Sequence, residues 1–265
     1  MTDALTQAVR HQLDLGRLLP LGGPDDGTWI TEEAAVRVLG RVVAGIPGVR
    51  MESLRVGAAP LEPVSEPAVR PPASALPPGP LRIDAAFTAS FGQPLPETAL
   101  EVRHALLDAA EGLGLTAVAA DLRVTDLHQG PETGGASRSA ARGLRPTADA
   151  EAEAARSSPP ATGTGSPQGL AGELAPVAAG VPGVARLTAV LGSRPVKVED
   201  HDDPPGRHIE VQLAVAPGHR PLDVARAVRA AVAAAATAGA PGPVTAAVLI
   251  TETTDRPPVT GSPAS

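Results

Sequence analysis

The sequence has no cysteine and no tyrosine, and only one tryptophan, two phenylalanines and one lysine among 265 residues. The absence of cysteine excludes disulfide bonds, thiolate metal sites and cysteine nucleophiles. Aromatic residues make up 1% of the chain and hydrophobic residues 43%, so a core can form but must consist mainly of Ala, Val and Leu. We interpret the preference for Arg over Lys, together with the excess of Ala, as the codon bias of a GC-rich genome.

The chain also lacks a basic run and a long apolar run. Its formal net charge is −7, which argues against nonspecific nucleic-acid binding, because that binding depends on neutralising phosphates. The longest weakly polar run, Ala230–Ala240, is too short to span a bilayer. Residues 1–14 lack the basic start and apolar core of a signal peptide. We therefore expect a cytoplasmic protein without a transmembrane segment.

No motif of a known catalytic chemistry is present. The six histidines are scattered, and the patterns His-Glu-x-x-His, Gly-x-Ser-x-Gly and Gly-x-x-x-x-Gly-Lys are all missing. The densest polar cluster, Glu199–Asp203, contains His201 and has the residue types of a divalent-metal site. Neighbours along a loop diverge instead of converging on one ion, so we predict a solvated hairpin tip. We expect no catalytic, cofactor-binding or metal-binding residues, and no cofactor.

Proline and glycine are abundant, with 30 and 28 residues, which indicates ordered modules separated by loose segments. A helix is predicted from Thr31, a typical N-cap, to Ile46, with acids in its first turn and Pro47-Gly48 after its end. The segments expected around it are a turn region over 19–27, strands over 51–57, 81–90 and 118–125, a Pro-rich loop over 58–80, and a helix from Pro96 to Ala109.

Residues 128–168 differ in composition from what precedes them. Leu144 is their only large aliphatic residue, so the segment cannot bury enough apolar surface to offset chain entropy, and we predict a disordered linker. After it we expect a helix over 170–180, a strand over 185–192 and an acidic loop over 195–205. The stretch Arg207–Glu252 then has the pattern of strand, turn, helix, loop and strand.

The two halves of the chain repeat one pattern. The strand–helix–strand region of the first half recurs 126 positions later, in phase and without a gap. The preceding helix and its Pro-Gly-Val turn recur 135 positions later, and the difference of nine corresponds to the longer Pro-rich loop. Matching positions include Ile83 and Ile209, Gly92 and Gly218, Val102 and Val228, Arg103 and Arg229, Val124 and Ile250, Leu39 and Leu174, and Pro47 and Pro182.

The repeat predicts an α/β (α+β) fold of two tandem small two-layer sandwich modules. Each module has the order helix, strand, strand, helix, strand. A helix between the last two strands favours a parallel pair with a right-handed crossover, and one polar strand face suggests that helices cover a single side of the sheet. The expected boundaries are an N-terminal helix and turn over 1–28, a first module over 29–127, a disordered linker over 128–168, a second module over 169–254, and a disordered tail over 255–265.

The most regular form of the module comprises the segments Val181–Val184, Ile209–Val215, Asp223–Val232 and Val244–Thr251. With these segments the module resembles the alkaline shock protein family of bacterial envelope-stress proteins. The second copy shows the pattern best, and in the first copy Ile30–Glu33 and Ile46–Val49 match the helix and its turn. The resemblance implies a non-enzymatic role near the cell envelope, through a membrane-anchored partner and self-assembly, and it transfers no catalytic residue.

Partner contacts are the most plausible sites. Arg220, Arg226 and Arg229 are expected on the outer side of one helix, where they would contact an acidic partner or anionic lipid, or would simply be solvated. We expect Trp29 to pack against the first helix, and a helix over 2–15 to pack on its own domain or to dock on a partner. The predicted function is a partner-binding or self-associating scaffold without enzymatic activity; the alternative is a small-ligand binder or enzyme with its site between the modules.

Overall fold

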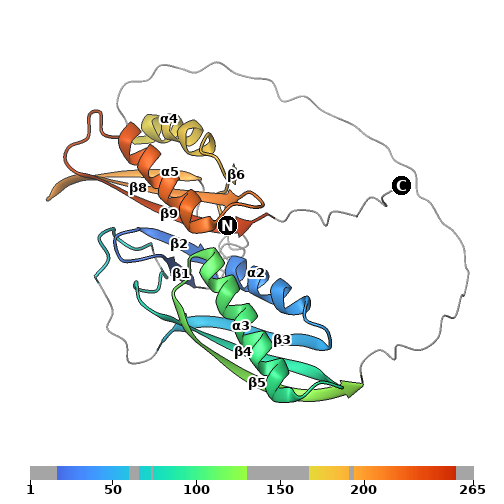
Figure 1. The fold of residues 1–265 in the computed structure, drawn as a ribbon. Coiled ribbons are helices and arrows are strands. Elements are labelled where there is room, and N and C mark those ends of the chain that lie inside the picture. The colour runs from blue at the N-terminus through green and yellow to red at the C-terminus, as the bar shows by residue number, and fades with distance from the viewer. Residues whose placement is uncertain (1–16, 60–65, 73, 130–166, 191–193, 255–265) are drawn as a thin grey trace, which may run out of the picture.

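The computed structural model of the protein describes residues 17–59, 66–72, 74–129, 167–190 and 194–254. These residues form four helices and nine strands in two sheets, so the predicted mixed α/β class is confirmed (Figure 1). The helix predicted over 2–15 and the tail over 255–265 lie outside the described residues. So does the linker, except for its two ends, which belong to a strand and a helix.

The smaller sheet is built from the first half of the chain. Its order is β3 (Val49–Ala58), β4 (Leu81–Phe91) and β5 (Ala117–Gln129), with α2 (Glu32–Ala44) before β3 and α3 (Leu95–Leu113) between β4 and β5. The strands β3 and β4 are antiparallel, whereas β4 and β5 are parallel, as the intervening helix predicts.

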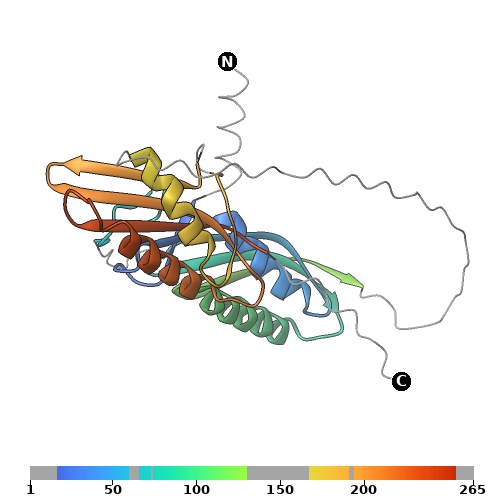
Figure 2. The same ribbon diagram turned by 90° about the horizontal axis from the view of Figure 1, so that it is seen from above.

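The larger sheet contains most of the second half. Its order is β1-β2-β9-β8-β6, and β7 also pairs with β8. The β7–β8 hairpin projects from the molecule in both views (Figure 1 and Figure 2). The elements are β1 (Leu18–Leu21), β2 (Thr28–Thr31), α4 (Pro167–Ala179), β6 (Val184–Leu187), β7 (Val196–Asp202), β8 (Pro205–Val215), α5 (Pro221–Ala235) and β9 (Val244–Thr253).

The β1–β2 hairpin joins the larger sheet, although it precedes the first half in sequence. β2 pairs in parallel with β9, with Ile30 opposite Ile250, and the Thr28 hydroxyl donates to the Leu21 carbonyl at 2.8 Å across the hairpin. The predicted turn region over 19–27 is therefore wrong for its first residues. β1 forms because its leucines are buried on both faces of the sheet, Leu19 and Leu21 in one cluster and Leu18 in another, and a four-residue strand is too short to show alternation.

One hydrophobic core serves both sheets. It joins Leu39 of α2, Leu106 of α3 and Phe87 of β4 to Ile209 of β8 and Val228 of α5, all fully buried. Helix α2 begins where the sequence predicts, because the Thr31 hydroxyl accepts the backbone N–H of residue 34 at 3.3 Å. Since the core is continuous, the two halves stabilise each other.

A second, small core lies on the other face of the larger sheet. Trp29 is buried there with Leu18, Val69 and Leu249, so it does not pack with α2 in the main core. The alternation of β2 explains this, because it directs Trp29 away from the helices and Ile30 toward them. A contact of Trp29 with the helix predicted over 2–15 stays a prediction, because that helix lies outside the described residues. Val69 belongs to the Pro-rich loop, which is hydrogen-bonded to the hairpin through the backbone of residues 18, 24, 68 and 76 and covers this face.

The predicted acidic loop over 195–205 is also wrong in its central part, which is strand β7. Val196 and Val198 are buried, and the alternation of these two valines with Lys197 and Glu199 gives the strand a packed face despite its acidic composition. The strand predicted over 185–192 is shorter than expected and ends at Leu187.

Candidate functional site

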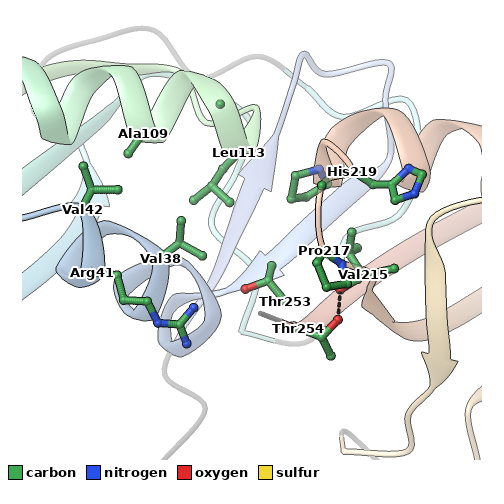
Figure 3. Close-up of a pocket in the computed structure, with 14 residues that line it drawn as sticks. Val38, Arg41, Val42, Ala109, Leu113, Val215, Pro217, His219, Thr253 and Thr254 are labelled. Atoms are coloured by element: carbon green, nitrogen blue, oxygen red, sulfur yellow. Dashed lines mark hydrogen bonds between the residues drawn. The ribbon is translucent and has the colours of Figure 1, made fainter. Parts of the chain in front are cut away.

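The described residues offer two places for a second molecule. The first is a cavity of about 390 Å³ between the helices of the first half and the β8–α5 loop, and the second is the outer edge of β5. Figure 3 shows the cavity, with residues of α2 and α3 on one side and residues around α5 and the end of β9 on the other.

The walls of the cavity are mainly apolar. Val38 and Val42 of α2 and Leu113 of α3 face Val215 and Pro217 near the carboxyl end of β8 (Figure 3). In sheets with parallel strands, ligands bind beyond the carboxyl ends of the strands, where loops form a crevice. The cavity lies at this end of the parallel pair of β8 and β9.

The polar groups of the cavity are few. The Thr254 hydroxyl donates to the Val215 carbonyl at 2.8 Å, whereas the Thr253 hydroxyl is buried and has no hydrogen-bond partner among the described residues. Two lining residues, Arg41 and His219, have basic side chains, and no acidic residue is among the described residues that line the cavity. The cavity is thus a mainly apolar, open space with few polar groups.

Two glycines set the shape of the cavity. Gly114 ends α3 at a φ of +98°, and a Cβ there would lie 2.5 Å from Cβ of Leu222, so the end of α3 can approach the start of α5 closely. Gly218, with a φ of +79°, makes the turn from β8 into α5. Backbone hydrogen bonds of 2.8 Å from Gly22 to Gly114 and from Ala216 to Gly183 fix these segments.

The second place is the outer edge of β5. This 13-residue strand pairs with β4 on one side, and no described strand pairs with its other side. Two exposed hydrophobic residues lie on this sheet, namely Phe91 of β4 with 63% and Val118 of β5 with 57% exposure, and a third, Leu100 with 49%, lies on the neighbouring helix α3. The Arg103 side chain extends from α3 to β5 and donates to the Ala120 carbonyl at 3.2 Å.

The three predicted partner-contact arginines all have acceptors within the chain. Arg226 donates to both carboxylate oxygens of Asp26 at 2.7 and 2.8 Å, and this hydrogen bonding holds the Asp26 pKa below its usual value. Arg229 donates to the Asp25 carbonyl at 2.7 Å, and Arg220 donates to the Glu111 carbonyl at 3.0 Å. These contacts tie α5 to the hairpin turn and to α3. A partner contact through the arginines stays a prediction.

The acidic cluster divides into paired and exposed residues. Asp200 accepts two hydrogen bonds from Arg207, which lower the Asp200 pKa, and Glu199 pairs with Lys197, which lowers the Glu199 pKa. Asp202 and Asp203 at the hairpin end are exposed. In the part of the chain that the structure describes, no three acidic or histidine side chains are grouped as a metal site would require.

Comparison of the chain with protein-family models, curated proteins and solved structures finds no match in any of the three. Among the described helices, none combines the length and the apolar character that a bilayer crossing requires.

Proposed function

We propose that the protein is a non-enzymatic scaffold that binds a protein partner through the outer edge of β5. In this proposal the chain is two tandem modules resembling alkaline shock proteins, acting in the cytoplasm and reaching the cell envelope through the partner. The observation that supports it best is the long outer edge of β5, which no described strand covers. The corresponding edge of the other sheet, that of β9, is covered by β2.

The duplication is supported by the register of the parallel strand pairs. The matched pairs of β4 and β5 from Arg82 to Ala89 each have a counterpart in β8 and β9 at the same distance of 126 positions. Both pairs also have a register shift at the same point, after Phe87 and after Leu213. The paired positions include Ile83 with Ala120 and Ile209 with Ala246, and Ala85 with Leu122 and Val211 with Val248.

The elements that precede the parallel strands agree with the offset of 135 positions found for the first helix and its turn. Helices α2 and α4 begin and end 135 positions apart. The strands after them, β3 and β6, also begin 135 positions apart and pair antiparallel with β4 and β8. The second half differs in having the additional strand β7.

The edge of β9 illustrates what the edge of β5 can accept. Under the duplication β5 corresponds to β9, and the outer edge of β9 is covered by the parallel strand β2 of this same chain. An uncovered strand exposes backbone N–H and C=O groups that can pair with another strand. β5 contains neither proline nor lysine, two residues that commonly protect such edges.

The neighbouring helices indicate where the added strand would lie. In the second half, Arg229 and Arg226 of α5 contact the turn of the hairpin that covers β9. Their counterparts on α3 are Arg103, which contacts β5 itself, and Leu100, which is exposed. We infer that a partner strand on β5 would accept a hydrogen bond from Arg103 and cover Leu100 with an apolar residue.

The proposal is tested by photo-crosslinking in cells. A benzoylphenylalanine at position 118 of β5 should form a discrete adduct with the partner, or with a second copy of the chain. The same group at the exposed position 55 of β3, on the opposite edge of the sheet, should not form it.

Two substitutions and a control sharpen the test. Leu100→Glu and Arg103→Glu should each reduce the position-118 adduct at least about fivefold, because they place a carboxylate where the partner strand packs. Ala234→Glu, on the exposed side of α5, adds the same charge and should leave the adduct unchanged. Equal adducts at positions 118 and 55, or no effect of either α3 variant, would contradict a strand-addition site on β5.

A further inference from the structure

The two outer strands of the smaller sheet differ in what already contacts them. On β3 the Val56 N–H donates to the Glu32 carboxylate of α2 at 3.2 Å, so its single proton is no longer open to another strand. On β5, which lies at the rim of the sheet in Figure 1, the Ala120 carbonyl accepts from Arg103 but keeps a second lone pair. An added strand therefore finds its backbone partners on β5.

The face of β5 that points away from the helices bears one acid and one base. Asp121 and Arg123 are both exposed, and between them Leu122 packs against the main core. Asp121 pairs with Arg82 of β4, whereas Arg123 has no acceptor among the described residues. A strand that brings a carboxylate opposite Arg123 would provide one.

These two charges select one way of pairing β5 with the β5 of a second copy. In an antiparallel pair with two-fold symmetry, opposite residues lie on the same face, so the axis passes through a residue. With the axis at Leu122, Asp121 of each copy lies opposite Arg123 of the other, and Ala120 lies opposite Val124 on the helix side. An axis at Asp121 or at Arg123 would instead place two like charges opposite each other, which destabilises a sheet. The edge of β5 is thus complementary in charge to itself.

Helix α3 adds an apolar contact near the same axis. It runs antiparallel to β5, because it connects two parallel strands. Arg103 of α3 contacts the Ala120 carbonyl, so Leu100, one turn earlier on the helix, lies toward the level of Leu122. Leu100 is exposed, and Leu100 of the second copy would cover it across the axis.

We propose that the partner of the β5 edge is a second copy of this chain, paired antiparallel through β5 about a two-fold axis at Leu122. The inference rests on the proposed function, because it takes β5 as the binding edge. Pairing joins the three strands of each smaller sheet into one continuous sheet. Each Arg123 gains the Asp121 carboxylate of the other copy, and that carboxylate can accept from Arg82 and Arg123 together.

The test is sedimentation velocity of the purified full chain alone. We expect a dimer with a Kd on the order of 10 μM, because an interface of one strand edge and one helix contact is small. A chain that stays monomeric up to about 200 μM, some twentyfold above that Kd, overturns the second copy as the partner. The proposed function does not fall with it, since an adduct between position 118 and another protein in cells would still identify β5 as a binding edge. A monomeric chain without any position-118 adduct would refute both.

Charge reversal tests the register. Asp121→Arg and Arg123→Asp each place like charges opposite each other on both sides of the axis, and each should weaken self-association at least about tenfold. An equimolar mixture of the two variants should form a heterodimer within about threefold of the wild-type affinity, because opposite charges then face each other again. Circular dichroism checks that each variant is folded. A dimer that tolerates both reversals, or variants that stay monomeric when mixed, overturns the pairing.

The matched control is Asp84→Arg on the central strand β4. Like Asp121→Arg, it reverses an exposed carboxylate that contacts Arg82. It lies one strand away from the edge, so it should change the dimer Kd less than about twofold at physiological salt. An effect as large as that of Asp121→Arg would mean that the reversals act through Arg82 or net charge, and would overturn the assignment to the β5 edge.

An introduced cysteine locates the axis independently of charge. The chain has no cysteine of its own, so a single new thiol can link only to its counterpart in another copy. Leu122→Cys should form a disulfide-linked dimer at least about tenfold faster than Val118→Cys on the same strand, because only residues at the axis come within disulfide distance of themselves. Equal rates for the two variants overturn the axis at Leu122.

Discussion

Replacing Arg207 by Met should destabilise the protein strongly, although the substitution preserves the length of the apolar stem. Arg207 is only 7% exposed and donates to both carboxylate oxygens of Asp200 at 2.7 and 2.9 Å. It also donates to the carbonyls of Ala236 at 2.9 Å, Gly239 at 3.3 Å and Ala238 at 3.5 Å, at and beyond the C-terminal end of α5. One guanidinium thus joins the β7–β8 hairpin to the end of a helix.

The expected loss of stability follows from the Asp200 carboxylate, which remains without its partner after the substitution. Removing one partner of a buried charge pair costs about 3–5 kcal/mol, because the other charge stays without compensation. The Asp200 side chain is 30% exposed and can recover some hydration, which favours the lower end of that range. We therefore expect the free energy of unfolding to fall by about 3 kcal/mol near pH 7.

The effect should depend on pH in a defined direction. Hydrogen bonding from Arg207 lowers the pKa of Asp200 in the folded protein. Its stabilising contribution is therefore present above the pKa of Asp200 in the unfolded chain, and is lost as the pH falls through the lower pKa of the folded state. The difference between wild type and Arg207→Met should accordingly shrink in acid.

The assay is urea unfolding followed by circular dichroism at neutral and acidic pH. The matched control is Arg186→Met, because Arg186 lies in the same sheet and pairs with Glu252 but is 56% exposed. Exposed ion pairs contribute about 0–1 kcal/mol, so the control should lose no more than that. If Arg207→Met costs no more than Arg186→Met, the reasoning about the buried guanidinium is refuted.

Two further predictions concern the junction of the halves. Gly114→Ala should lower the free energy of unfolding by about 2–4 kcal/mol, because of the φ of +98° and the close approach of Leu222. The control is Gly112→Ala, where an added Cβ meets no atom within 4 Å, and it should be neutral or stabilising in the same urea assay. A double-mutant cycle of Asp26→Asn and Arg226→Leu should give a coupling of about 0.5–1 kcal/mol near neutral pH, since Arg226 is 50% exposed. That coupling should vanish as the pH falls through the lowered pKa of Asp26, and a coupling that persists in acid would contradict the charge pair.

Local patterns in the sequence were sufficient for the elements that have clear periodicity. The cap at Thr31 and the spacing of Leu39 predicted α2, and the alternation around Ile83 and Val124 predicted β4 and β5. The parallel pairing of β4 with β5 followed from the helix between them. These features depend on residues close in sequence, where backbone geometry alone sets the period.

The same patterns were insufficient for short or composition-biased strands. β1 has four residues with a proline among them and shows no recognisable alternation. β7 alternates only at Val196 and Val198, and its acidic residues favoured a loop. The face of the sheet on which Trp29 packs was missed for a related reason, since a single aromatic side chain does not reveal which face of its strand is covered.

The sequence by itself determined the helix–strand–strand–helix–strand order of the first half and the repeat of strand, helix and strand, because the spacing of apolar residues along the chain indicates both. Only the tertiary structure decided that the N-terminal hairpin closes the edge of β9, that Arg226 pairs with Asp26 200 positions away, and that residues of five separate elements line one open cavity. Contacts of this kind depend on how the two halves pack, and they cannot be predicted from patterns of residues that are neighbours in the sequence. For the same reason the open edge of β5 became visible as a candidate site only beside the covered edge of β9.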